Sequence, residues 1–282
     1  MDLSPIDPVE IALQEDVGAG DITGDFFVPA TARASGRIVA REPAIIAGTQ
    51  TAAEVFQRVD PNTHVDIICH DGAAVSAEDL VMQMAGTARS LLKAERVALN
   101  FLQRLCGVAT LTRKFVDAAA NEHVKILDTR KTTPGLRALE KAAVLAGGGA
   151  NHRFGLFDMV LVKDNHLAAH PQLGAFRQSL SEFRSKRPEV KIEVEADTLA
   201  QVRALLELDG VDVILLDNMK PAQVREAVAL GKGKVKFEAS GGVTLKNTGQ
   251  IAATGVDYIS IGALTHSARA IDLALELTYV SA

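Results

Sequence analysis

The sequence contains no tryptophan, and aromatic residues make up only 4% of its 282 residues. A core built from this chain must therefore be aliphatic. Basic residues are not in excess either: 30 Lys and Arg stand against 35 Asp and Glu, a net charge of −5. A protein that grips a nucleic-acid backbone usually carries a basic surplus. We therefore expect no nucleic acid among the partners of this chain.

Cysteine is also scarce. Cys69 and Cys106 are the only two, and their spacing is not that of metal ligands. Such usage excludes a disulfide framework and favours a reducing compartment. The sequence has no apolar run of about 18 residues, the length that predicts a membrane span. Its start, MDLSPIDPVE, lacks the basic and apolar regions of an export signal. We therefore expect a cytoplasmic protein without membrane association.

The remaining composition, 48% hydrophobic and 23% charged, is that of a globular protein with one large domain or two smaller ones. Alternating and apolar runs predict short strands at 37–41, 43–48 and 65–69. From Ser76 onward, apolar residues recur at helical spacing. We expect two helices there, at 76–105 and 108–121, separated at Gly107.

Beyond residue 123, six short apolar runs alternate with helical patterns. The runs cover 124–128, 159–163, 192–195, 213–217, 235–238 and 258–261, and the helices are expected at 135–148, 171–187, 198–209, 220–231, 244–254 and 267–280. This alternation predicts a parallel sheet with helical crossovers. The near-equal spacing of the last four strands favours a βα-barrel. A complete barrel has eight strands, so either this one is incomplete or two strands are hidden in the sequence.

Polar residues and glycines follow every one of these strands, and in a βα-barrel this end carries the active site. One group is cationic: Arg130, Lys131, His152, Arg153 and Lys163. The natural partner of such a group is an anion, either a carboxylate or a phosphate, which arginine can bind through two hydrogen bonds. Three glycines, 147–149, precede two of these residues and predict a loop of close backbone approach.

A second group consists of the acids Glu195 and Asp217 on successive strands. Such carboxylates could bind ribose hydroxyls, hold Mg²⁺ or stabilise a cationic transition state. The plainer alternative is a structural ion pair with Lys131 or Lys163. Glycines after the last two strands, in Ser240-Gly241-Gly242 and at Gly262, are typical of phosphate sites. Together these residues predict a ligand with a phosphate, a sugar-like polyol and further anionic groups.

Residues 128–166, DTRKTTPGLRALEKAAVLAGGGANHRFGLFDMVLVKDNH, closely resemble the quinolinate phosphoribosyltransferase family, also called nicotinate-nucleotide pyrophosphorylase (carboxylating). The resemblance covers nearly the whole chain. It continues through ALQEDVGAGDIT, AERVALNFLQRLCGVAT, IEVEAD, ILLDN, EASGGV and TGVDYISIGALTHS. One small departure is Cys106, where the family pattern has serine, and we expect no effect of this on the chemistry.

The resemblance implies an α/β fold in which an N-terminal α/β sandwich domain, residues 1–112, precedes an incomplete parallel α/β barrel, residues 113–266. It implies that a last helix, 267–282, returns to the first domain. The implied enzyme is a pentosyltransferase that joins quinolinate and phosphoribosyl pyrophosphate and requires Mg²⁺. Its products would be nicotinate mononucleotide, pyrophosphate and CO₂, for de novo NAD biosynthesis.

Carried over position by position, the resemblance also implies roles for individual residues. The quinolinate-binding positions fall on Arg96, Arg130, His152, Arg153 and Lys163. Lys131 would lie between the two substrates, and Glu195 and Asp217 match the acids on the ribose and metal side, with the direct metal ligands unassigned. The phosphate site and its neighbours fall on Thr129, Ser240, Gly241, Gly242, Ile261, Gly262 and Ala263. Arg96 would enter the site of a neighbouring subunit, so a homodimer is implied.

Two alternatives stay open at this point. The first is a sister branch on the same scaffold, associated with molybdenum transport, which should lack parts of the dicarboxylate-binding set. The second is a non-catalytic sensor of a phosphorylated sugar, which would need neither Glu195 nor Asp217.

Overall fold

The computed structural model describes residues 7–167 and 173–280. The chain divides into two compact units. The first consists of residues 1–113, 132–148 and 263–282, and the second of residues 114–131 and 149–262. Segment 132–148, which the sequence places in the barrel domain, thus clusters with the first unit. Among the described residues, no helix combines the length and apolar composition needed to cross a bilayer.

The first unit contains an antiparallel sheet in the order β12-β1-β5-β3. Its strands are β1 (Arg33–Ala40), β3 (His64–Ile67), β5 (Leu80–Thr87) and β12 (Leu273–Tyr279). A smaller pair joins β2 (Ala44–Ile45) and β4 (Ala74–Val75). The helices are α1 (Pro8–Val17), α2 (Ile22–Phe27), α3 (Thr49–Val59), α5 (Arg137–Ala146), α11 (Ala263–His266) and the first part of α4 (Ala88–Ala119).

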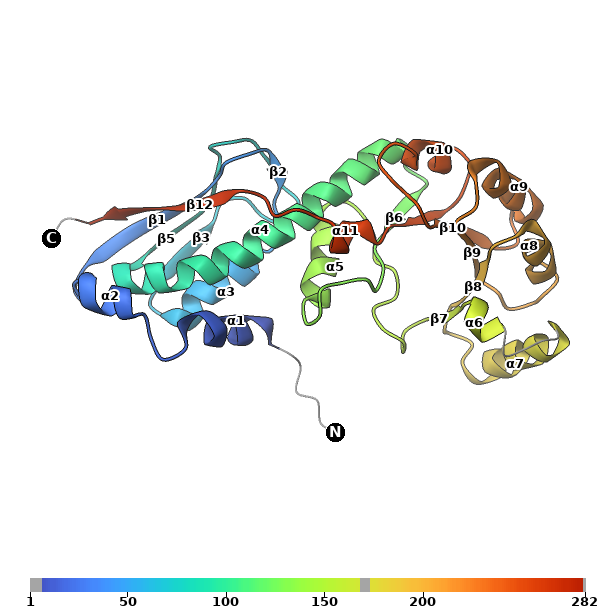
Figure 1. Ribbon diagram of the computed structural model, residues 1–282, viewed down its shortest axis with the longest axis horizontal. Helices are drawn as coiled ribbons and strands as arrows, with labels where there is room; N and C mark the ends of the chain where they lie inside the picture. Colours follow the sequence, from blue (N-terminus) through green and yellow to red (C-terminus); the bar gives the residue numbers. More distant parts are fainter. Residues whose placement is uncertain (1–6, 168–172, 281–282) are drawn as a thin grey trace. The chain divides into compact units, whose positions relative to one another are not determined.

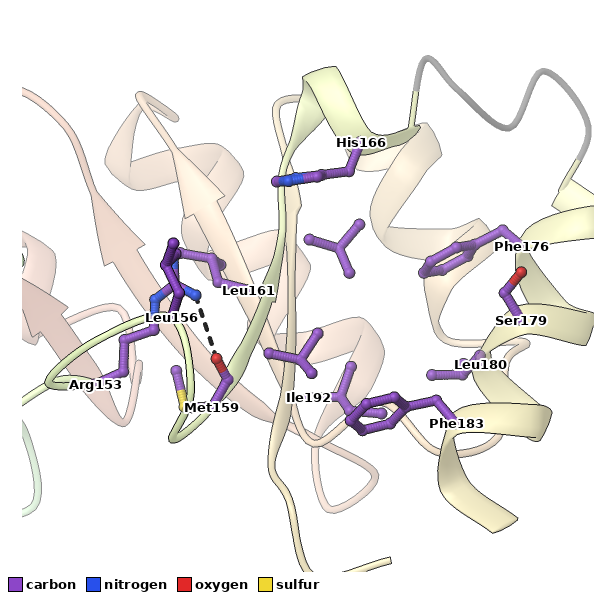
Figure 2. A pocket seen from close by; sticks show the side chains of 12 residues that line it. Arg153, Leu156, Met159, Leu161, His166, Phe176, Ser179, Leu180, Phe183 and Ile192 are labelled. Atoms are coloured by element: carbon purple, nitrogen blue, oxygen red, sulfur yellow. Dashed lines mark hydrogen bonds between the residues drawn. The ribbon is translucent and has the colours of Figure 1, made fainter. Parts of the chain in front are cut away.

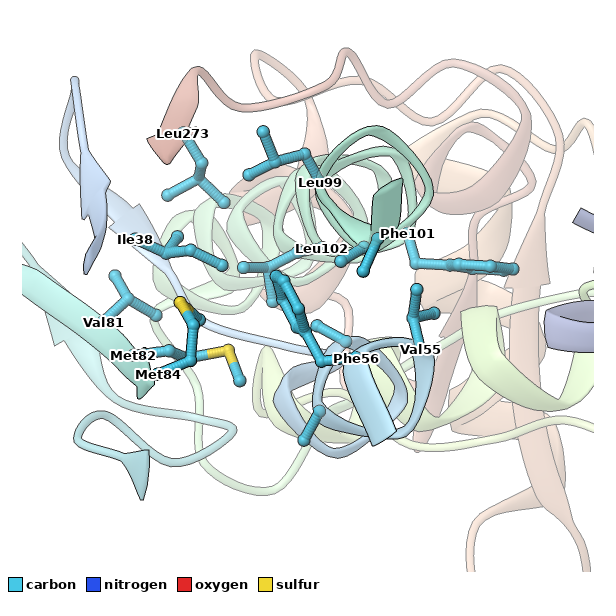
Figure 3. Packing of buried hydrophobic residues seen from close by; sticks show 14 of the residues in the cluster. Ile38, Val55, Phe56, Val81, Met82, Met84, Leu99, Phe101, Leu102 and Leu273 are labelled. Atoms are coloured by element: carbon cyan, nitrogen blue, oxygen red, sulfur yellow. The ribbon is translucent and has the colours of Figure 1, made fainter. Parts of the chain in front are cut away.

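The core of this unit is aliphatic, as the shortage of aromatic residues predicts. Leu99 and Leu102 of α4 pack against Ile38 of β1 and Met82 of β5, and Phe56 of α3 lies beside them (Figure 3). Each of these side chains is almost completely removed from solvent. Burying such a side chain contributes about 1.5–3 kcal/mol to folding, so this cluster holds the sheet and the two helices together.

Two sequence predictions in this unit are wrong. Residues 80–87 form strand β5 rather than helix, and α4 then runs without a break through Gly107. The run Met82 to Gly86 alternates between buried and exposed positions along β5, a period of two that the helical interpretation missed. Gly107 does not end the helix. It lets the carbonyl of Arg269 approach to 2.0 Å from where a Cβ would stand.

The prediction of a helix at 267–280 is also wrong, because Leu273–Tyr279 form β12. The segment does return to the first unit, where β12 pairs antiparallel with β1 and Leu277 lies opposite Gly36. Leu273, Leu275 and Leu277 alternate with more polar neighbours and pack on the core. That alternation is typical of a strand with one buried face. The segment therefore follows the two-residue period of a strand and not the 3.6-residue period of a helix.

The second unit is built on six parallel strands in the order β6-β11-β10-β9-β8-β7. They are β6 (Lys125–Leu127), β7 (Val160–Val162), β8 (Ile192–Ala196), β9 (Val213–Asp217), β10 (Lys236–Ser240) and β11 (Tyr258–Ser260). All six predicted strands are confirmed. Although β6 and β7 are consecutive along the chain, they occupy opposite edges of the sheet. The sheet is therefore a barrel left open between these two strands, and the predicted incomplete α/β barrel is confirmed.

The helices of this unit are α6 (Asp164–Leu167), α7 (Leu173–Lys186), α8 (Leu199–Leu205), α9 (Pro221–Gly231) and α10 (Thr248–Ala252). Figure 1 shows α8 and α9 beside the strands that they connect. The predicted start of α7 at 171 falls outside the described residues. The helix predicted at 244–254 is reduced to 248–252. Before it, Asn247 accepts a hydrogen bond from the Thr244 amide at 2.7 Å and donates one to the Gly242 carbonyl at 3.0 Å, which makes a turn.

Candidate active site

Three polar side chains share the carboxyl end of the parallel sheet because of the strand register. Along β8, Ile192, Val194 and Ala196 are buried on one face, so Glu195 points to the other. Glu195 lies in register with Leu215, two residues before Asp217, and Asp217 lies in register with Ser240. Glu195, Asp217 and Ser240 therefore project from the same side of adjacent strands. The sequence places them at this same end of their strands.

Glu195 is the centre of a small charged cluster. The ammonium of Lys163 lies 3.5 Å from Glu195 Oε2, so the ion pair that the plainer interpretation predicted is present. Burial raises the pKa of Glu195, Lys163 lowers it, and the negative charges of Asp217 and Asp164 raise it. Carboxylate oxygens of Glu195, Asp197 and Asp217 also lie within 4.8 Å of one another. The oxygen donors that Mg²⁺ prefers are thus gathered at this point.

The loop after β10 is shaped by two glycines. Gly241 has φ +87° and Gly242 has φ +60°, both in the left-handed region. A Cβ on Gly241 would stand 2.2 Å from Oδ1 of Asn218, the residue whose side-chain amide donates to Asp217 at 2.7 Å. The loop can therefore lie against the end of β9 only with glycine at position 241. This predicted phosphate loop offers backbone N–H groups rather than the start of a long helix.

Two of the predicted cations lie near each other. Burial lowers the pKa of Arg153, and the positive charge of Arg130 lowers it further. One guanidinium nitrogen of Arg153 donates to the Met159 carbonyl at 3.2 Å, which holds the side chain in place (Figure 2). Two partly buried guanidinium groups held this close repel each other. The negative charges of Glu193 and Asp158 partly offset this repulsion. A ligand that carries negative charge would offset it further.

His152 does not join this cationic group as the sequence predicts, because its ring turns toward two buried acids. Its Nε2 lies 2.9 Å from Oε2 of Glu193 on β8 and 3.6 Å from Oε2 of Glu238 on β10. Both acids are almost fully buried. Burial raises the pKa of Glu193 and that of Glu238. A hydrogen bond between the two carboxyls lowers the pKa of Glu193 and raises that of Glu238. That bond requires a proton on one of the two.

Sequence reasoning missed Glu238 as a site residue and left Glu193 without a role. A usable signal was present, since both are charged residues inside apolar strand segments. Asp128 was also missed. It is fully buried at the end of β6 and accepts a hydrogen bond from the His152 amide at 2.9 Å.

The other predicted residues occupy the following places. Thr129 follows β6, and its hydroxyl accepts the Lys131 amide at 3.1 Å, while the Lys131 side chain is exposed. Ile261 and Gly262 follow β11, and the Ile261 amide donates to the Leu127 carbonyl at 2.9 Å. Ala263 opens α11, and Arg96 is exposed on α4, both in the first unit.

A cavity of about 410 Å³ lies between β7 and α7. Figure 2 shows Phe176, Leu180 and Phe183 of α7 facing Ile192 across it, while Leu161 points to the other side of β7. Its lining is apolar apart from three side chains, those of Arg153, His166 and Ser179. Because it offers neither the acids nor the glycine loop, this cavity is not the polar site at the strand ends.

An open parallel barrel with paired arginines, two facing acids and a glycine loop at one end defines a class of protein. It is an enzyme that binds an anionic compound next to a phosphorylated sugar. The sequence matches "Quinolinate phosphoribosyl transferase, N-terminal domain" over residues 21–106 and "Quinolinate phosphoribosyl transferase, C-terminal domain" over residues 108–276. The chain belongs to the quinolinate phosphoribosyl transferase family.

Individual relatives agree with this assignment. The chain is 43% identical over 266 residues to a probable nicotinate-nucleotide pyrophosphorylase [carboxylating] of Bacillus subtilis. The alignment covers 94% of this chain and 90% of that protein. It is 41% identical over 285 residues to a mitochondrial quinolinate phosphoribosyltransferase [decarboxylating] of Nicotiana tabacum, covering 95% and 81%. The crystal structure of NadC from Streptococcus pyogenes is 38% identical, with a TM-score of 0.92 and complete coverage of both chains.

Proposed function

We propose that the chain transfers the phosphoribosyl group of phosphoribosyl pyrophosphate to the ring nitrogen of quinolinate. The carboxyl group beside that nitrogen leaves as CO₂, and the products are nicotinate mononucleotide, pyrophosphate and CO₂, as in de novo NAD biosynthesis. The observation that carries this proposal is Arg153, a partly buried cation that the positive charge of Arg130 repels. Quinolinate is a dianion, and its two carboxylates would relieve that repulsion.

The second substrate fits the remaining strand ends. Backbone N–H groups of Gly241, Gly242 and Gly262, with the Ser240 hydroxyl, suit its 5′-phosphate. Ile261 and Ala263 flank Gly262 along the chain, and Thr129 follows β6, the strand next to β11. Glu195 and Asp217 would face the ribose, and Lys131 would lie between the two substrates.

The chemistry that follows needs charge placement more than proton transfer. As the ring nitrogen displaces pyrophosphate, positive charge develops on the sugar, as it does in glycoside cleavage. The carboxylates of Glu195 and Asp217 would stabilise that charge. The ring nitrogen is cationic once it is ribosylated, so the electron pair left by CO₂ on the neighbouring carbon is stabilised within the ring until that carbon takes up a proton from solvent. The reaction therefore requires no separate electron-sink cofactor.

Mg²⁺ fits the donors at this site. The oxygen atoms of Glu195, Asp197 and Asp217, which lie within 4.8 Å of one another, would hold it together with oxygens of the pyrophosphate. When bound, the ion would neutralise charge on the leaving pyrophosphate. Removing Mg²⁺ with a chelator should therefore abolish turnover and weaken phosphoribosyl pyrophosphate binding more than quinolinate binding.

The quinolinate site is proposed to be completed in a homodimer by Arg96 of the partner subunit. Arg96 is exposed on α4, where it can reach another chain. Subunit complementation tests this. Inactive R96A and inactive K131A chains, mixed and allowed to exchange, should form hybrids with one intact site and recover about half the activity per dimer. No recovery despite confirmed exchange would mean that Arg96 serves its own chain or none.

A cytoplasmic location is proposed from the cysteines, since Cys69 and Cys106 are both free thiols. Burial raises the pKa of Cys106 to about 12, so this departure from the family pattern is an unreactive thiol.

The direct test of substrate identity is product analysis with quinolinate and with nicotinate, which lacks the second carboxylate. We expect nicotinate mononucleotide from quinolinate and phosphoribosyl pyrophosphate, and little from nicotinate. Equal turnover of both acids would contradict the decarboxylating assignment and favour another activity on this scaffold. Binding of phosphoribosyl pyrophosphate without any turnover would favour the sensor alternative.

A further inference from the structure

The imidazole of His152 is held at both nitrogens. Nδ1 lies 2.7 Å from the backbone nitrogen of Arg153, whose N–H donates to it. Nε2 lies 2.9 Å from Oε2 of Glu193. Because Nδ1 accepts a hydrogen bond, it carries no proton there, and the ring proton must be on Nε2. His152 is thus a neutral ring that donates to Glu193, and each ring contact depends on the other.

Glu238 supports the same ring from a different strand. Its Oε2 lies 3.6 Å from His152 Nε2, and its carboxyl is hydrogen-bonded to Glu193 and to Ser260 of β11. Oε1 of Glu193 and Oε1 of Glu238 are both buried without a protein donor. Each carboxyl is thus held through its other contacts, to His152, to Ser260 or to the other acid. The pair therefore forms a fixed acceptor for the ring, supported by three strands.

The backbone before His152 is fixed separately. The Ala150 amide donates to the Ile126 carbonyl at 2.8 Å, and the Asp128 amide donates to the Ala150 carbonyl at 3.2 Å. Asp128 then accepts the His152 amide. The segment therefore lies along β6, at the open edge of the barrel. The ring of His152 is the link from this segment across the barrel to β8 and β10, and its Nδ1 receives the next amide, that of Arg153.

We propose that Glu193 and Glu238 are positioning residues for quinolinate. They hold the His152 ring in one orientation and as the Nε2–H tautomer, and the ring in turn fixes the backbone from which Arg153 projects. This inference rests on the proposed function in one respect, since it takes Arg153 to be a quinolinate ligand. His152 would thus hold the Arg153 backbone in place, in addition to any contact that it makes with the substrate.

Steady-state kinetics with two variants at Glu193 test the proposal. In E193A the ring loses its acceptor, and we expect the KM for quinolinate to rise about 10-fold or more, as when an orienting partner of a histidine is removed. The kcat and the KM for phosphoribosyl pyrophosphate should change by less than about 3-fold. E193Q keeps an acceptor oxygen for Nε2–H and should restore most of the quinolinate KM. Equal impairment of E193A and E193Q would overturn the proposal.

D257A is the matched control for loss of a barrel acid. Asp257 accepts the Phe237 amide at 2.9 Å at the opposite, amino end of β10. Its removal should lower the melting temperature without raising the quinolinate KM. A rise as large as that in E193A would show that any weakening of the barrel has this effect, and the proposal would fail.

The tautomer can be read without substrate, by NMR of protein labelled with ¹⁵N-histidine, with H152Q to assign the signals. We expect His152 to carry its proton on Nε2 alone, and a mixture of tautomers in E193A. A proton on Nδ1 in the wild-type protein, or no change in E193A, would overturn the proposal even if the chain proved not to use quinolinate. So would a stoichiometric transition metal in the purified protein that E238Q loses, because His152, Glu193 and Glu238 also have the spacing of a metal site.

Discussion

The ammonium of Lys163 lies 3.5 Å from Oε2 of Glu195, at neighbouring strand ends of the open barrel. About half of the Lys163 side chain is exposed, whereas Glu195 is 12% exposed. A half-exposed ion pair contributes little to stability. We propose that substrate separates this pair, so that Lys163 turns to a carboxylate of quinolinate and Glu195 faces the sugar.

Glu195 is therefore expected to affect rate more than quinolinate affinity. E195Q keeps the shape of the side chain and removes its charge. We expect kcat to fall about 10²-fold, the scale of losing one electrostatic contact in a transition state. The dissociation constant for quinolinate, measured by calorimetry, should stay close to that of the wild-type protein. A near-normal kcat would leave Glu195 as a structural partner of Lys163 only.

Arg130 and Arg153 should show the opposite behaviour. R130A and R153A are each expected to weaken quinolinate binding by about 2–5 kcal/mol, the cost of removing one partner of a hydrogen-bonded charge pair. Calorimetric titration with quinolinate and, separately, with phosphoribosyl pyrophosphate measures this. An equal loss for the two ligands would count against assigning these arginines to quinolinate. Arg203, which pairs with Glu226 on α9, is the matched control, and R203A should alter neither affinity.

The glycine loop should be specific for the phosphorylated substrate. G241A adds a Cβ only 2.2 Å from Asn218 Oδ1, at a φ of +87°. We expect the KM for phosphoribosyl pyrophosphate to rise about 10-fold or more, since such backbone strain costs on the order of 1–3 kcal/mol. G233A isolates the backbone effect, because Gly233 has a φ of +81° and nothing within 4 Å of an added Cβ. If both variants raised the KM equally, the loop would have no special role.

Glu238 should make stability depend on pH. Burial, and next the charge of Glu193, raise the pKa of Glu238 from 4.5 to about 8. The unfolded chain therefore releases this proton at lower pH than the folded chain does. Where the folded state binds more protons, the free energy of unfolding falls as pH rises. The loss occurs between about pH 4.5 and pH 8 and is at most about 1.4 kcal/mol per pH unit.

E238Q has no such proton to lose. Its free energy of unfolding relative to wild type, measured by urea denaturation, should therefore rise between about pH 5 and pH 8. Because Glu238 and Glu193 titrate as a pair, the slope belongs to both. A difference between the two proteins that stays constant with pH would mean that Glu238 is ionised throughout this range in the folded protein.

The strand ends could be predicted from the sequence because parallel strands follow one rule. Apolar runs identify the strands, and residues such as Asp217 and Ser240 then fall at the same edge without knowledge of strand order. The first unit was harder to predict. Segments 80–87 and 273–279 contain enough leucine, valine and methionine to satisfy a helical period as well as a period of two, and their pairing with β1 favours the strand.

The partners of His152 could not be predicted for a different reason. Glu193 and Glu238 lie on strands β8 and β10, which are separated by β9, and their contact depends on strand order, register and curvature together. Local sequence places a histidine next to an arginine and so suggests two cations. In the structure the histidine turns to Glu193 instead, and the Arg153 amide donates to its Nδ1.

The most direct test of the account is release of CO₂ from quinolinate labelled in the carboxyl group beside the ring nitrogen. We predict one labelled CO₂ for each pyrophosphate formed, and release only when phosphoribosyl pyrophosphate and Mg²⁺ are both present, because the ring must become cationic first. Release of label without phosphoribosyl pyrophosphate, or pyrophosphate formation with the label retained in the nucleotide, would contradict it.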